Sequence, residues 1–459
     1  MSNENYYLTL NKCCFSSSSS LGHTERKVER QVDRISRLPN EVIAYILSFL
    51  PTKDAITTSV LSHRWISLWT FADALHFPNH CPSFLTKENF VDIMNSVLSQ
   101  RESKCIKRLS FSILNNCYIP HLVSSIVSMA TTQKVYEIDL SLYRLKVYLP
   151  HQLYTCKTLT VLRLVGTFHL NVPSHLHLPL LKILHLNLLC FVDDHDDDAL
   201  MRFLSSCPAL EQLFYEEVKF KRTSLFGICV PSLKRLFVRS FDERLHIKTP
   251  LLECLVMKET KAINYVVENL DNLKEAHIGI HFDYENKKVK ENIANIFNGV
   301  RKTRFLCLDL YTTEVLTYAC LEFPTFDHLG HLQLYLKILD SYFLVELLLE
   351  KCPNLEFLEI IKVDELCDNE IEWRQPTIVP SCLSSHLTTF IFRDYEGTDE
   401  EFELISYILN SGKVLKRTTI YFESSCWNPS ETSDAVLELS SLPRASKDNR
   451  TNYVLQSRS

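Results

Sequence analysis

The stretch DRISRLPNEVIAYILSFLPTKDAITTSVLSHRWISLWTFADAL, residues 33–75, is the segment around which the chain is organised. It is short, and it carries two tryptophans four residues apart, Trp65 and Trp69. Its apolar spacing and its prolines predict three short helices. Pro39 stands at the start of the first helix, where a missing backbone N–H is harmless, and Pro51 ends that helix.

The first helix has more apolar surface than one domain can cover. Four of its apolar residues share one face by their spacing: Ile43, Ile46, Leu47 and Leu50. Three more lie on its other faces: Val42, Tyr45 and Phe49. A short helix that is apolar most of the way round must be covered on two sides, by its own domain and by a partner. The sequence therefore predicts a permanent partner for this head.

The second and third helices have polar residues at their expected starts. Thr52 is placed to cap the second helix, and Ser62 to cap the third, because hydroxyl side chains accept hydrogen bonds from the first N–H groups of a helix. In the third helix, Trp65, Leu68 and Trp69 fall on one face. A unit of this size lies near the lower limit for independent folding, and it contains no cysteine.

Composition describes an ordinary globular protein, with 46% hydrophobic and 23% charged residues. A net charge of −6 gives no general attraction to nucleic acid or acidic membranes. No apolar run is long enough for a membrane span. The sixteen scattered cysteines and the lack of a recognisable signal peptide predict a reduced, intracellular protein of the nucleus or cytoplasm, while residues 1–32 are typical of a flexible tail.

From about residue 105 to 422 the chain repeats one template: apolar, two variable residues, apolar, one variable residue, apolar. It begins at thirteen positions: Ile106, Val135, Leu159, Leu181, Leu210, Leu233, Leu252, Leu273, Phe305, Leu329, Leu355, Leu387 and Leu415. The mean step is about 26 residues, which is the period of a leucine-rich repeat. The pattern predicts an irregular α/β solenoid in which each unit adds one short strand to a curved parallel sheet.

Several repeats add a helix after the strand. The clearest cover residues 198–206 and 341–350, and each is followed by Cys-Pro and then the next leucine, in SCPALEQL and KCPNLEFL. The proline ends the helix and the leucine starts the next strand.

Residues 38–70, LPNEVIAYILSFLPTKDAITTSVLSHRWISLWT, resemble an F-box in its plant form, through the Leu-Pro opening, the ILSFLP centre and the closing RW and LW pairs. His63 stands where a lysine is common in that family. The resemblance implies a three-helix unit that docks on the Skp-type adaptor of a cullin–RING ubiquitin ligase. It implies that these residues form the docking surface or the packing behind it: Leu38, Pro39, Ile43, Ile46, Leu47, Leu50, Pro51, Val60, Leu61, Trp65, Leu68 and Trp69.

Residues 380–422, PSCLSSHLTTFIFRDYEGTDEEFELISYILNSGKVLKRTTIYF, resemble the FBD segment of plant F-box proteins with leucine-rich repeats. Their pattern predicts a strand, a turn at Gly397, a helix over residues 399–410 and a final strand. The expected organisation is a tail (1–32), an F-box (33–78), leucine-rich repeats (105–379), an FBD segment that ends the solenoid (380–422) and a polar C-terminal extension (423–459) that frays.

Three charged constellations invite a binding interpretation, and each has a simpler one. Residues 193–198 are five aspartates and His195, which could hold a divalent cation but also suit a solvated loop before a helix. His169, His175, His177 and His185 could form a zinc site but also suit a solenoid surface. The basic stretches 287–290 and 301–304 could bind phosphate but lack interleaved aromatics. We favour the simpler interpretation of each and expect no metal and no cofactor.

No catalytic motif supports an enzyme. We expect a non-catalytic substrate receptor of an SCF-type E3 ubiquitin ligase, linked through the Skp-type adaptor to cullin and RING subunits. Its concave strand face would bind a target protein, without nucleic acid or membrane. Outward strand positions nominated for the target are Arg163, His185, Phe214, Phe237, Arg239, Tyr311 and Tyr335. The alternatives are a repeat scaffold acting outside the ligase, with the head as a cap, and a hydrolase or transferase with an unrecognised site.

Overall fold

The computed structural model describes residues 34–35, 37–78, 87–103, 105–113, 120–169, 172–187, 199–216, 226–239, 244–261, 264–268, 270–281, 289–319, 323–363, 378–423 and 429–456. The chain divides into two units at residue 43. The described part of the first unit is a turn, closed by the hydrogen bond from Leu38 N to Ile35 O, and the beginning of helix α2 (Asn40–Leu47). All that follows belongs to the second unit.

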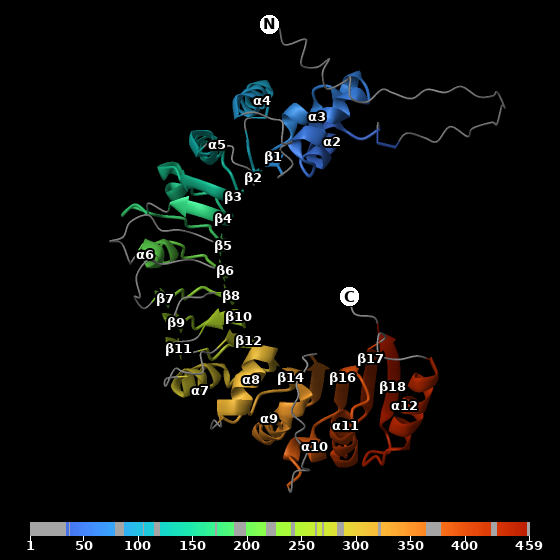
Figure 1. Ribbon diagram of the computed structural model, residues 1–459. Coiled ribbons are helices and arrows are strands. Elements are labelled where there is room, and N and C mark those ends of the chain that lie inside the picture. Colours follow the sequence, from blue (N-terminus) through green and yellow to red (C-terminus); the bar gives the residue numbers. More distant parts are fainter. Residues whose placement is uncertain are drawn as a thin grey trace, which may run out of the picture. The chain divides into compact units, whose positions relative to one another are not determined.

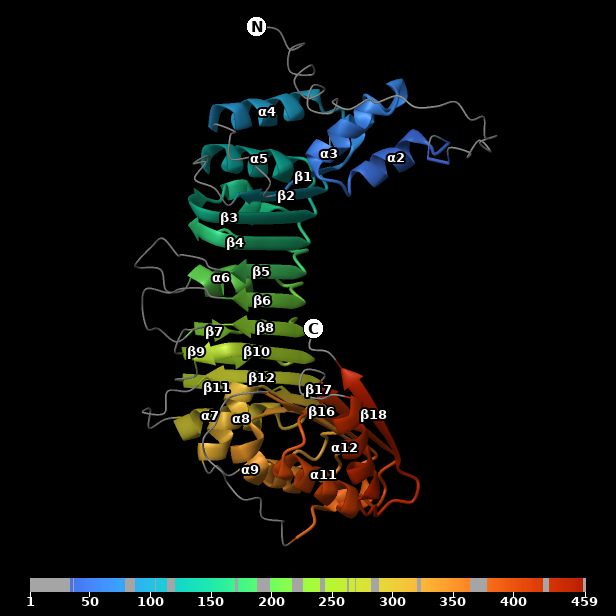
Figure 2. The ribbon, with the colours of Figure 1, turned by 45° about the vertical axis from the view of Figure 1, so that its right-hand side comes forward.

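A parallel sheet dominates the second unit, as the repeat pattern predicts (Figures 1 and 2). Within the described residues it has fifteen strands, and each pairs with its neighbours in sequence order apart from three strands that lie elsewhere. The strands are β1 (Ala74–Phe77), β2 (Arg108–Ile113), β3 (Glu137–Tyr148), β4 (Val161–His169), β5 (Ile183–Asn187), β6 (Gln212–Glu216), β8 (Arg235–Arg239), β10 (Cys254–Lys261), β12 (Glu275–His281), β13 (Phe305–Leu308), β14 (His331–Leu336), β15 (Phe357–Lys362), β16 (Thr389–Tyr395), β17 (Arg417–Glu423) and β18 (Arg450–Gln456).

Each of the thirteen predicted repeat units contributes one strand of this sheet, from β2 to β17. The apolar template residues point to the buried side, as Leu162 and Leu164 of β4 and Leu184 and Leu186 of β5 illustrate. The residues between them point to the opposite side, because successive side chains of a strand alternate. We call this opposite side the strand face.

One repeat was predicted in the wrong register. The template was set to start at Phe305, but Phe305 pairs with Glu275 and His331 of the neighbouring strands and faces outward with them. The buried positions of this unit are Thr303, Leu306 and Leu308. Thr303 occupies the first buried position of this unit, and its hydroxyl donates a 2.8 Å hydrogen bond to Phe305 O. Because the template requires an apolar residue at that position, it could not place the unit correctly.

The buried side of the sheet is covered by a second layer. Most of it is helical: α4 (Lys87–Gln100), α5 (Pro120–Thr132), the short 3₁₀ turn η4 (His151–Thr155), α6 (Ala199–Ser205), α7 (Val289–Val300), α8 (Leu310–Ala319), α9 (Ile338–Lys351), α10 (Ser381–Ser385), α11 (Asp399–Ser411) and α12 (Pro429–Ser441). In the middle repeats the layer is a small parallel sheet of β7 (Phe226–Ile228), β9 (Arg244–Lys248) and β11 (Asn264–Glu268). Figures 1 and 2 show α5, α6, α7 and this sheet on one side of the long sheet.

The helices predicted from the sequence are confirmed with small shifts of their ends. The helix predicted over residues 198–206 is α6 (Ala199–Ser205), the one over 341–350 lies within α9, and the one over 399–410 lies within α11. Gly397 has a φ of 86°, which suits the turn before α11.

The start of α11 is held by a fully buried carboxylate, that of Glu401. Thr398 and Glu401 form a capping box, and the Glu401 carboxylate also accepts hydrogen bonds from Gly397 N at 2.8 Å and Lys362 Nζ at 2.6 Å. Burial would lower the pKa of Lys362, but Glu401 and Glu396 outweigh it and raise that pKa. The ion pair therefore joins the end of β15 to α11.

The sheet extends beyond the predicted repeats at both ends. β1 precedes the first of them, and β18 follows the last, paired with β17 over seven residues. The prediction that the solenoid ends at residue 422 and that 423–459 is a fraying polar extension is therefore wrong. Few apolar residues occur there, but Ala435 and Leu439 are buried one turn apart on α12, and Leu442, just past the end of that helix, is buried as well.

If α12 closes the sheet by packing, its buried and exposed leucines should behave differently. Leu439 is 0% exposed, and Leu437 is 68% exposed in the same helix. We expect Leu439→Ala to lower the local stability of the last unit by about 2–4 kcal/mol through a cavity. Leu437→Ala should change it by less than about 0.5 kcal/mol. Hydrogen exchange of the β18 amides measures both, and equal protection in the two variants would contradict the packing role.

Candidate functional site

The head is built from α2, α3 (Thr52–Thr57) and three short 3₁₀ turns, η1 (Thr58–Val60), η2 (His63–Trp65) and η3 (Leu68–Phe71). The third predicted helix is therefore a pair of 3₁₀ turns. The predicted caps are also wrong: Ser62 makes no capping hydrogen bond with its side chain, and α3 has Pro51 at its cap position. Thr52 is instead the first helical residue, and its hydroxyl accepts a 2.9 Å hydrogen bond from His76 N of β1.

The twelve nominated adaptor-binding residues fall into two groups. The buried ones form the packing of the head: Ile43, Leu47, Trp65, Leu68 and Trp69. The exposed ones are Pro39, Ile46, Leu50, Val60 and Leu61, while Leu38 and Pro51 are half-buried. The expected single face of Ile43, Ile46, Leu47 and Leu50 is thus split, because Ile43 and Leu47 lie one turn apart on the buried side, and Leu50 lies beyond the end of α2.

A large part of the head's apolar surface is open to solvent. Tyr45 and Phe49 are 60% and 56% exposed, and their rings meet edge to face at 4.9 Å. Val60 and Leu61, at 74% and 63%, are more exposed still. The other exposed large apolar residues of the head are Ile35, Val42, Ile46, Leu50, Ile66 and Phe71. Exposed apolar residues at this density are typical of a protein-binding surface.

Sequence reasoning had noted that Tyr45 and Phe49 lie off the main apolar face, without nominating them for binding. It missed Ile66 and Phe71. Their signal was weak, because 3₁₀ turns do not repeat at the helical period on which the face assignment relied.

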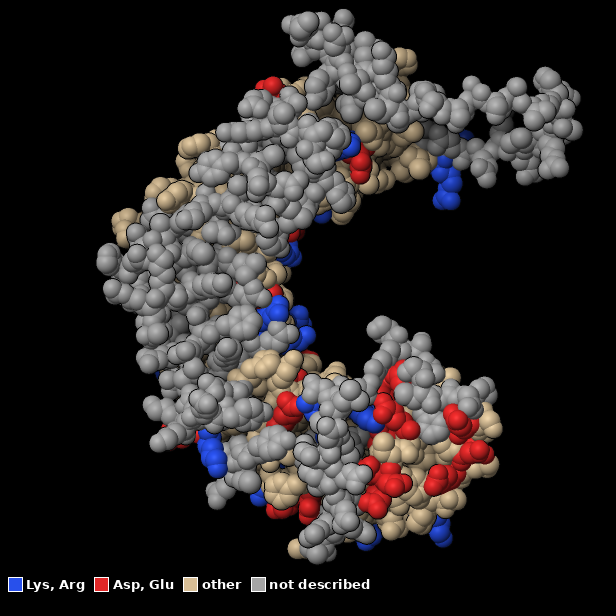
Figure 3. All heavy atoms as spheres, viewed as in Figure 1, with Lys and Arg blue, Asp and Glu red and all other residues tan. Residues whose placement is uncertain are grey.

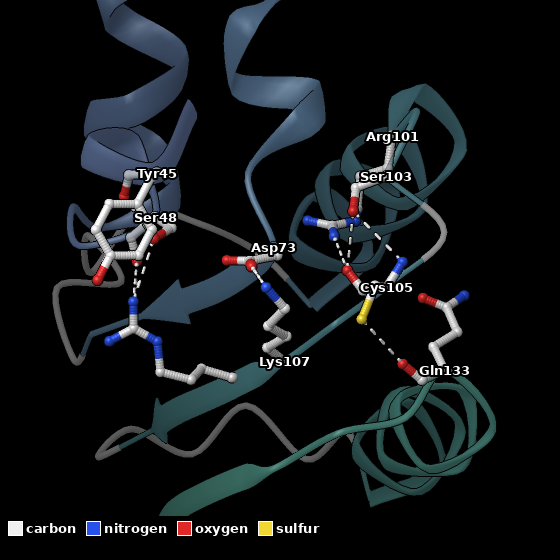
Figure 4. A network of polar contacts seen from close by, with 9 residues as sticks. Tyr45, Ser48, Asp73, Arg101, Ser103, Cys105, Lys107 and Gln133 are labelled. Carbon is white, nitrogen blue, oxygen red and sulfur yellow. Dashed lines mark hydrogen bonds and ion pairs between the residues drawn. The ribbon is translucent and has the colours of Figure 1, made fainter. Parts of the chain in front are cut away.

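The head continues directly into the sheet. β1 begins three residues after η3 and pairs with β2 from Ala74 with Arg108 to Phe77 with Phe111. Figure 4 shows the contacts around this junction. Lys107 Nζ lies 2.6 Å from the Asp73 carboxylate, and this hydrogen bond raises the pKa of Lys107. Ser103 N donates to Thr70 O at 3.0 Å, so the end of the head and the chain entering β2 are tied together.

Arg108 of β2 joins the exposed ring of Phe49, two residues past the end of α2, to the sheet. Its Nη2 donates to Ser48 Oγ at 3.2 Å, and its guanidinium lies 4.5 Å from the centre of the Phe49 ring. Arg101 Nη2 donates to Cys105 O at 3.0 Å, and burial lowers the pKa of Arg101 (Figure 4). The C-terminal end of α2 is therefore positioned by side chains of the first repeat.

The strand face is a second candidate surface, and strand pairing decides which of its nominated residues are neighbours. Arg163, His185, Phe214 and Phe237 occupy one row across β4, β5, β6 and β8, since each pairs with the next. Arg239 lies two residues further along β8. Tyr335 lies on β14, four strands from Phe237 in the order of the sheet, and opposite Ile361 of β15.

Tyr311 was nominated as an outward strand residue, and this is wrong. It belongs to the first turn of α8, where its ring lies 3.6 Å from that of His281. The register error at Phe305 caused the misplacement. β13 ends at Leu308, and α8 begins two residues later.

Because β13 ends early, some backbone groups of the neighbouring strands β12 and β14 form hydrogen bonds with side chains of α8 instead. The Thr312 hydroxyl donates to Ile278 O and accepts from Ile280 N, both at 2.9 Å. On the other side, the Thr313 hydroxyl donates to Tyr335 O at 2.6 Å. Two buried threonines thus replace the ladder that a longer strand would provide.

Stacked rings that sequence reasoning missed form a second row of the strand face. Phe305, His331 and Phe357 lie opposite one another on β13, β14 and β15, with ring centres 4.6 Å and 4.0 Å apart. Burial lowers the pKa of His331. In the sequence, each of these rings stands two residues after the first residue of its repeat unit. The repeat template treats that position as variable, so it did not mark the rings.

Several carboxylates of the strand face are already engaged by neighbours. Glu216 accepts hydrogen bonds from Asn187 Nδ2 and shares one with His185 Nε2, each at 2.9 Å. Further along, Glu359 pairs with Arg393, whose guanidinium lies over the Tyr421 ring. These contacts order the side chains across adjacent strands.

The other binding interpretations find little in the structure. Residues 193–198 and 287–288 lie outside the described residues, as does the side chain of His169. His175 and His177 are exposed, and Lys302 pairs with Asp271 at 2.6 Å. Within the described ranges there is no group of three or more metal-ligating side chains. Among the same residues, no helix combines the length and apolarity that a membrane crossing needs.

A head with a large exposed apolar surface, joined to a leucine-rich repeat sheet, defines the class of F-box proteins with leucine-rich repeats. Family models agree with this: the F-box domain matches residues 35–72, the repeats of the FBD-associated F-box protein At5g56370 match 123–271, and FBD matches 375–420.

Whole-length relatives give the family more closely. The chain is 31% identical over 436 residues to the F-box/FBD/LRR-repeat protein At4g26340 of Arabidopsis thaliana, covering 91% of this chain and 99% of that protein. It is 30% identical over 432 residues to the FBD-associated F-box protein At4g10400 of the same plant, covering 92% and 100%. The chain belongs to the plant F-box/FBD/LRR-repeat family. Membership supports a receptor role in which the F-box binds a Skp-type adaptor and the repeats bind a protein.

Asp139 offers a test of the electrostatics of the strand face. Burial raises the pKa of Asp139, although Arg163, His185 and His76 oppose this. Because the folded state holds the proton more tightly, the protein is more stable below the unfolded pKa and loses that stability as pH rises through the folded pKa. Asp139→Asn should therefore raise the free energy of unfolding above that of wild type by less than about 1 kcal/mol at neutral pH, and leave it unchanged at acid pH. Chemical denaturation at a series of pH values measures the difference.

Glu253→Gln is the control of opposite sign. A hydrogen bond from Lys274 lowers the pKa of Glu253, so this carboxylate stabilises the fold above its unfolded pKa. The variant should lose stability relative to wild type as pH rises. If both substitutions stabilised the fold as pH rises, burial would not be what raises the pKa of Asp139.

Proposed function

We propose that the protein is the substrate-recognition subunit of an SCF-type cullin–RING E3 ubiquitin ligase. In this role the head binds the Skp-type adaptor, which links it to the cullin and RING subunits, and the strand face binds a target protein. The protein itself performs no bond chemistry. It raises the effective concentration of target lysines near a ubiquitin-loaded enzyme.

The observation that carries this proposal is the separation of the head's apolar residues into two sets. Trp65, Leu68 and Trp69 are buried and supply the packing that a small domain needs. Tyr45, Phe49 and their exposed neighbours keep much of their surface exposed in the part of the chain that the structure describes, although Arg108 lies over one face of the Phe49 ring. A head that only sealed the end of the repeats would have no use for that second set.

The junction supports the same proposal. A ligase receptor must hold its target at a defined place relative to the adaptor, since ubiquitin transfer depends on geometry. The continuous pairing of β1 with β2, the Lys107–Asp73 ion pair and the Arg108 contacts give such a connection. A flexible linker at this point would lose that advantage.

We place the complex in the nucleus or the cytoplasm. Support comes from the described cysteines, which are free thiols, among them the buried Cys207 and Cys352. Burial raises the pKa of Cys207 to about 12, which keeps it a neutral, packed side chain. Imaging of a fluorescent fusion in plant cells tests this, and a secreted fusion would contradict it.

Binding to a purified Skp-type adaptor tests the docking surface. Tyr45→Ser with Ile46→Ser, and separately Val60→Ser with Leu61→Ser, should each weaken binding about tenfold or more, because exposed anchors at an interface centre carry most of the energy. Leu47→Ala and Trp65→Ala do not serve, since both residues are buried and the head would lose its packing. Calorimetric titration gives the Kd.

Phe343→Ser is the matched control, because this phenylalanine is 58% exposed on α9 and lies outside the head. It should leave adaptor binding unchanged. If the intact protein does not bind the adaptor, or if it binds without bringing ubiquitin transfer when cullin and RING subunits are added, the protein acts as a scaffold outside the ligase. Turnover of a small substrate that survives removal of residues 33–75 would instead indicate an enzyme.

A further inference from the structure

One part of the strand face, over β4 to β10, combines an apolar centre with positive charge at its edges. The centre consists of Phe214 and Phe237, whose ring centres lie 6.0 Å apart, and of Val256, which pairs with Phe237 on β10. All three are half-buried, so their outer surfaces remain accessible.

Basic residues surround this centre. Arg163 lies in the same row on β4, where the next residue of the row is Asp139 of β3; Arg235 lies two residues before Phe237, and Arg239 lies two residues after it. Lys258, two residues after Val256, is exposed. Figure 3 shows Lys and Arg side chains gathered beside the strands that Figure 1 labels β8 and β10. We call Phe214, Phe237, Arg163, Arg235, Arg239 and Lys258 the basic patch.

The described outward positions over the basic patch carry more positive than negative charge, although Arg163 lies opposite Asp139 of β3 and the charge of Arg235 acts on the carboxylate of Glu253. At the described outward positions of β4, β5, β6, β8 and β10 the acidic residue is Glu216, and its carboxylate is engaged by His185 and Asn187. Within the described residues, no carboxylate lies in ion-pair distance of Arg163, Arg235 or Lys258. In a chain of net charge −6, this concentration of positive charge is a local feature.

The dimensions suit a short extended segment. Five adjacent strands, β4, β5, β6, β8 and β10, span four steps of the sheet. At about 4.8 Å a step this is about 19 Å, the length of about six extended residues. A segment lying across the strands would place one side chain on the Phe214 and Phe237 rings and its charges beside the flanking arginines and lysine.

We propose that the basic patch binds an acidic segment of the target protein, about six residues long, that carries one aromatic or branched aliphatic side chain. This rests on the proposed function, because it names the kind of target segment that the strand face accepts. The rings supply a desolvated apolar contact. The basic residues select against neutral and basic segments.

Fluorescence anisotropy tests the proposal with the full-length protein. The probe is a fluorescein-labelled, amidated hexapeptide of five acidic residues and one phenylalanine. Two comparison peptides replace the phenylalanine by serine or the acidic residues by lysine. Wild type should bind the acidic, aromatic peptide at least about tenfold more tightly than either, at low ionic strength.

Arg235→Glu with Lys258→Glu should weaken that binding about tenfold, because each reversal replaces an attraction by a repulsion. Lys157→Glu with Lys413→Glu is the control, since both lysines are exposed at loop positions outside the basic patch and the change in net charge is the same. It should change binding less than about twofold. Near-equal thermal midpoints confirm that both variants fold.

Equal weakening by the two double variants, no binding of the acidic peptide, or equal binding of the lysine peptide would each overturn the proposal. So would tighter binding of a single-stranded oligothymidylate to the same residues, which would make the surface a nucleic-acid site. Adaptor binding is measured on the same preparations. If the wild-type protein binds the adaptor but not the acidic peptide, this inference alone is refuted. If the wild-type protein does not bind the adaptor, the proposed function is refuted.

Discussion

The structure depends on the requirement that every repeat be flanked by another. A single unit has two or three leucines on the buried side of a short strand, and it cannot cover them or pair its backbone groups alone. Continuous pairing from β1 to β18 meets this requirement within the described residues. At the N-terminal end the added strand comes from the head, and at the C-terminal end it comes with α12. Neither end of the repeat array is therefore left as a bare, flat edge of leucine-rich strands.

The same requirement explains how the head is attached. Because β1 follows η3 so closely, the head and the first repeats share a sheet. The hydroxyl of Thr52 and the guanidinium of Arg108 then connect the short helices to backbone and side chains of that sheet. Packing in the head uses its tryptophans, so the exposed rings of Tyr45 and Phe49 remain available for a partner. Stability and docking are thus assigned to different residues of one small unit.

Alternation along each strand makes a similar division in the repeats. Buried positions are leucines and their equivalents, and their identity is constrained by packing. Outward positions are free to vary in charge and size, and pairing lines them up in rows. This produces the ring row of Phe305, His331 and Phe357 on one part of the face and the basic patch on another. A solenoid can therefore change what it recognises without changing what holds it together.

The sequence by itself determined the repeat architecture, the head and the FBD segment, because a leucine at a fixed spacing and a Leu-Pro opening are local signals. It also indicated helices over residues 198–206 and 399–410, which the structure has as α6 (Ala199–Ser205) and α11 (Asp399–Ser411). It failed where a polar residue occupies an apolar position, as at Thr303, and where few apolar residues suffice to pack, as in α12.

Only the tertiary structure decided which apolar residues of the head are buried, that Tyr311 lies on a helix, and that Arg163, Phe214 and Phe237 are neighbours. The physical reason is that burial and neighbourhood depend on pairing between segments more than twenty residues apart. The period of one segment carries no information about that pairing.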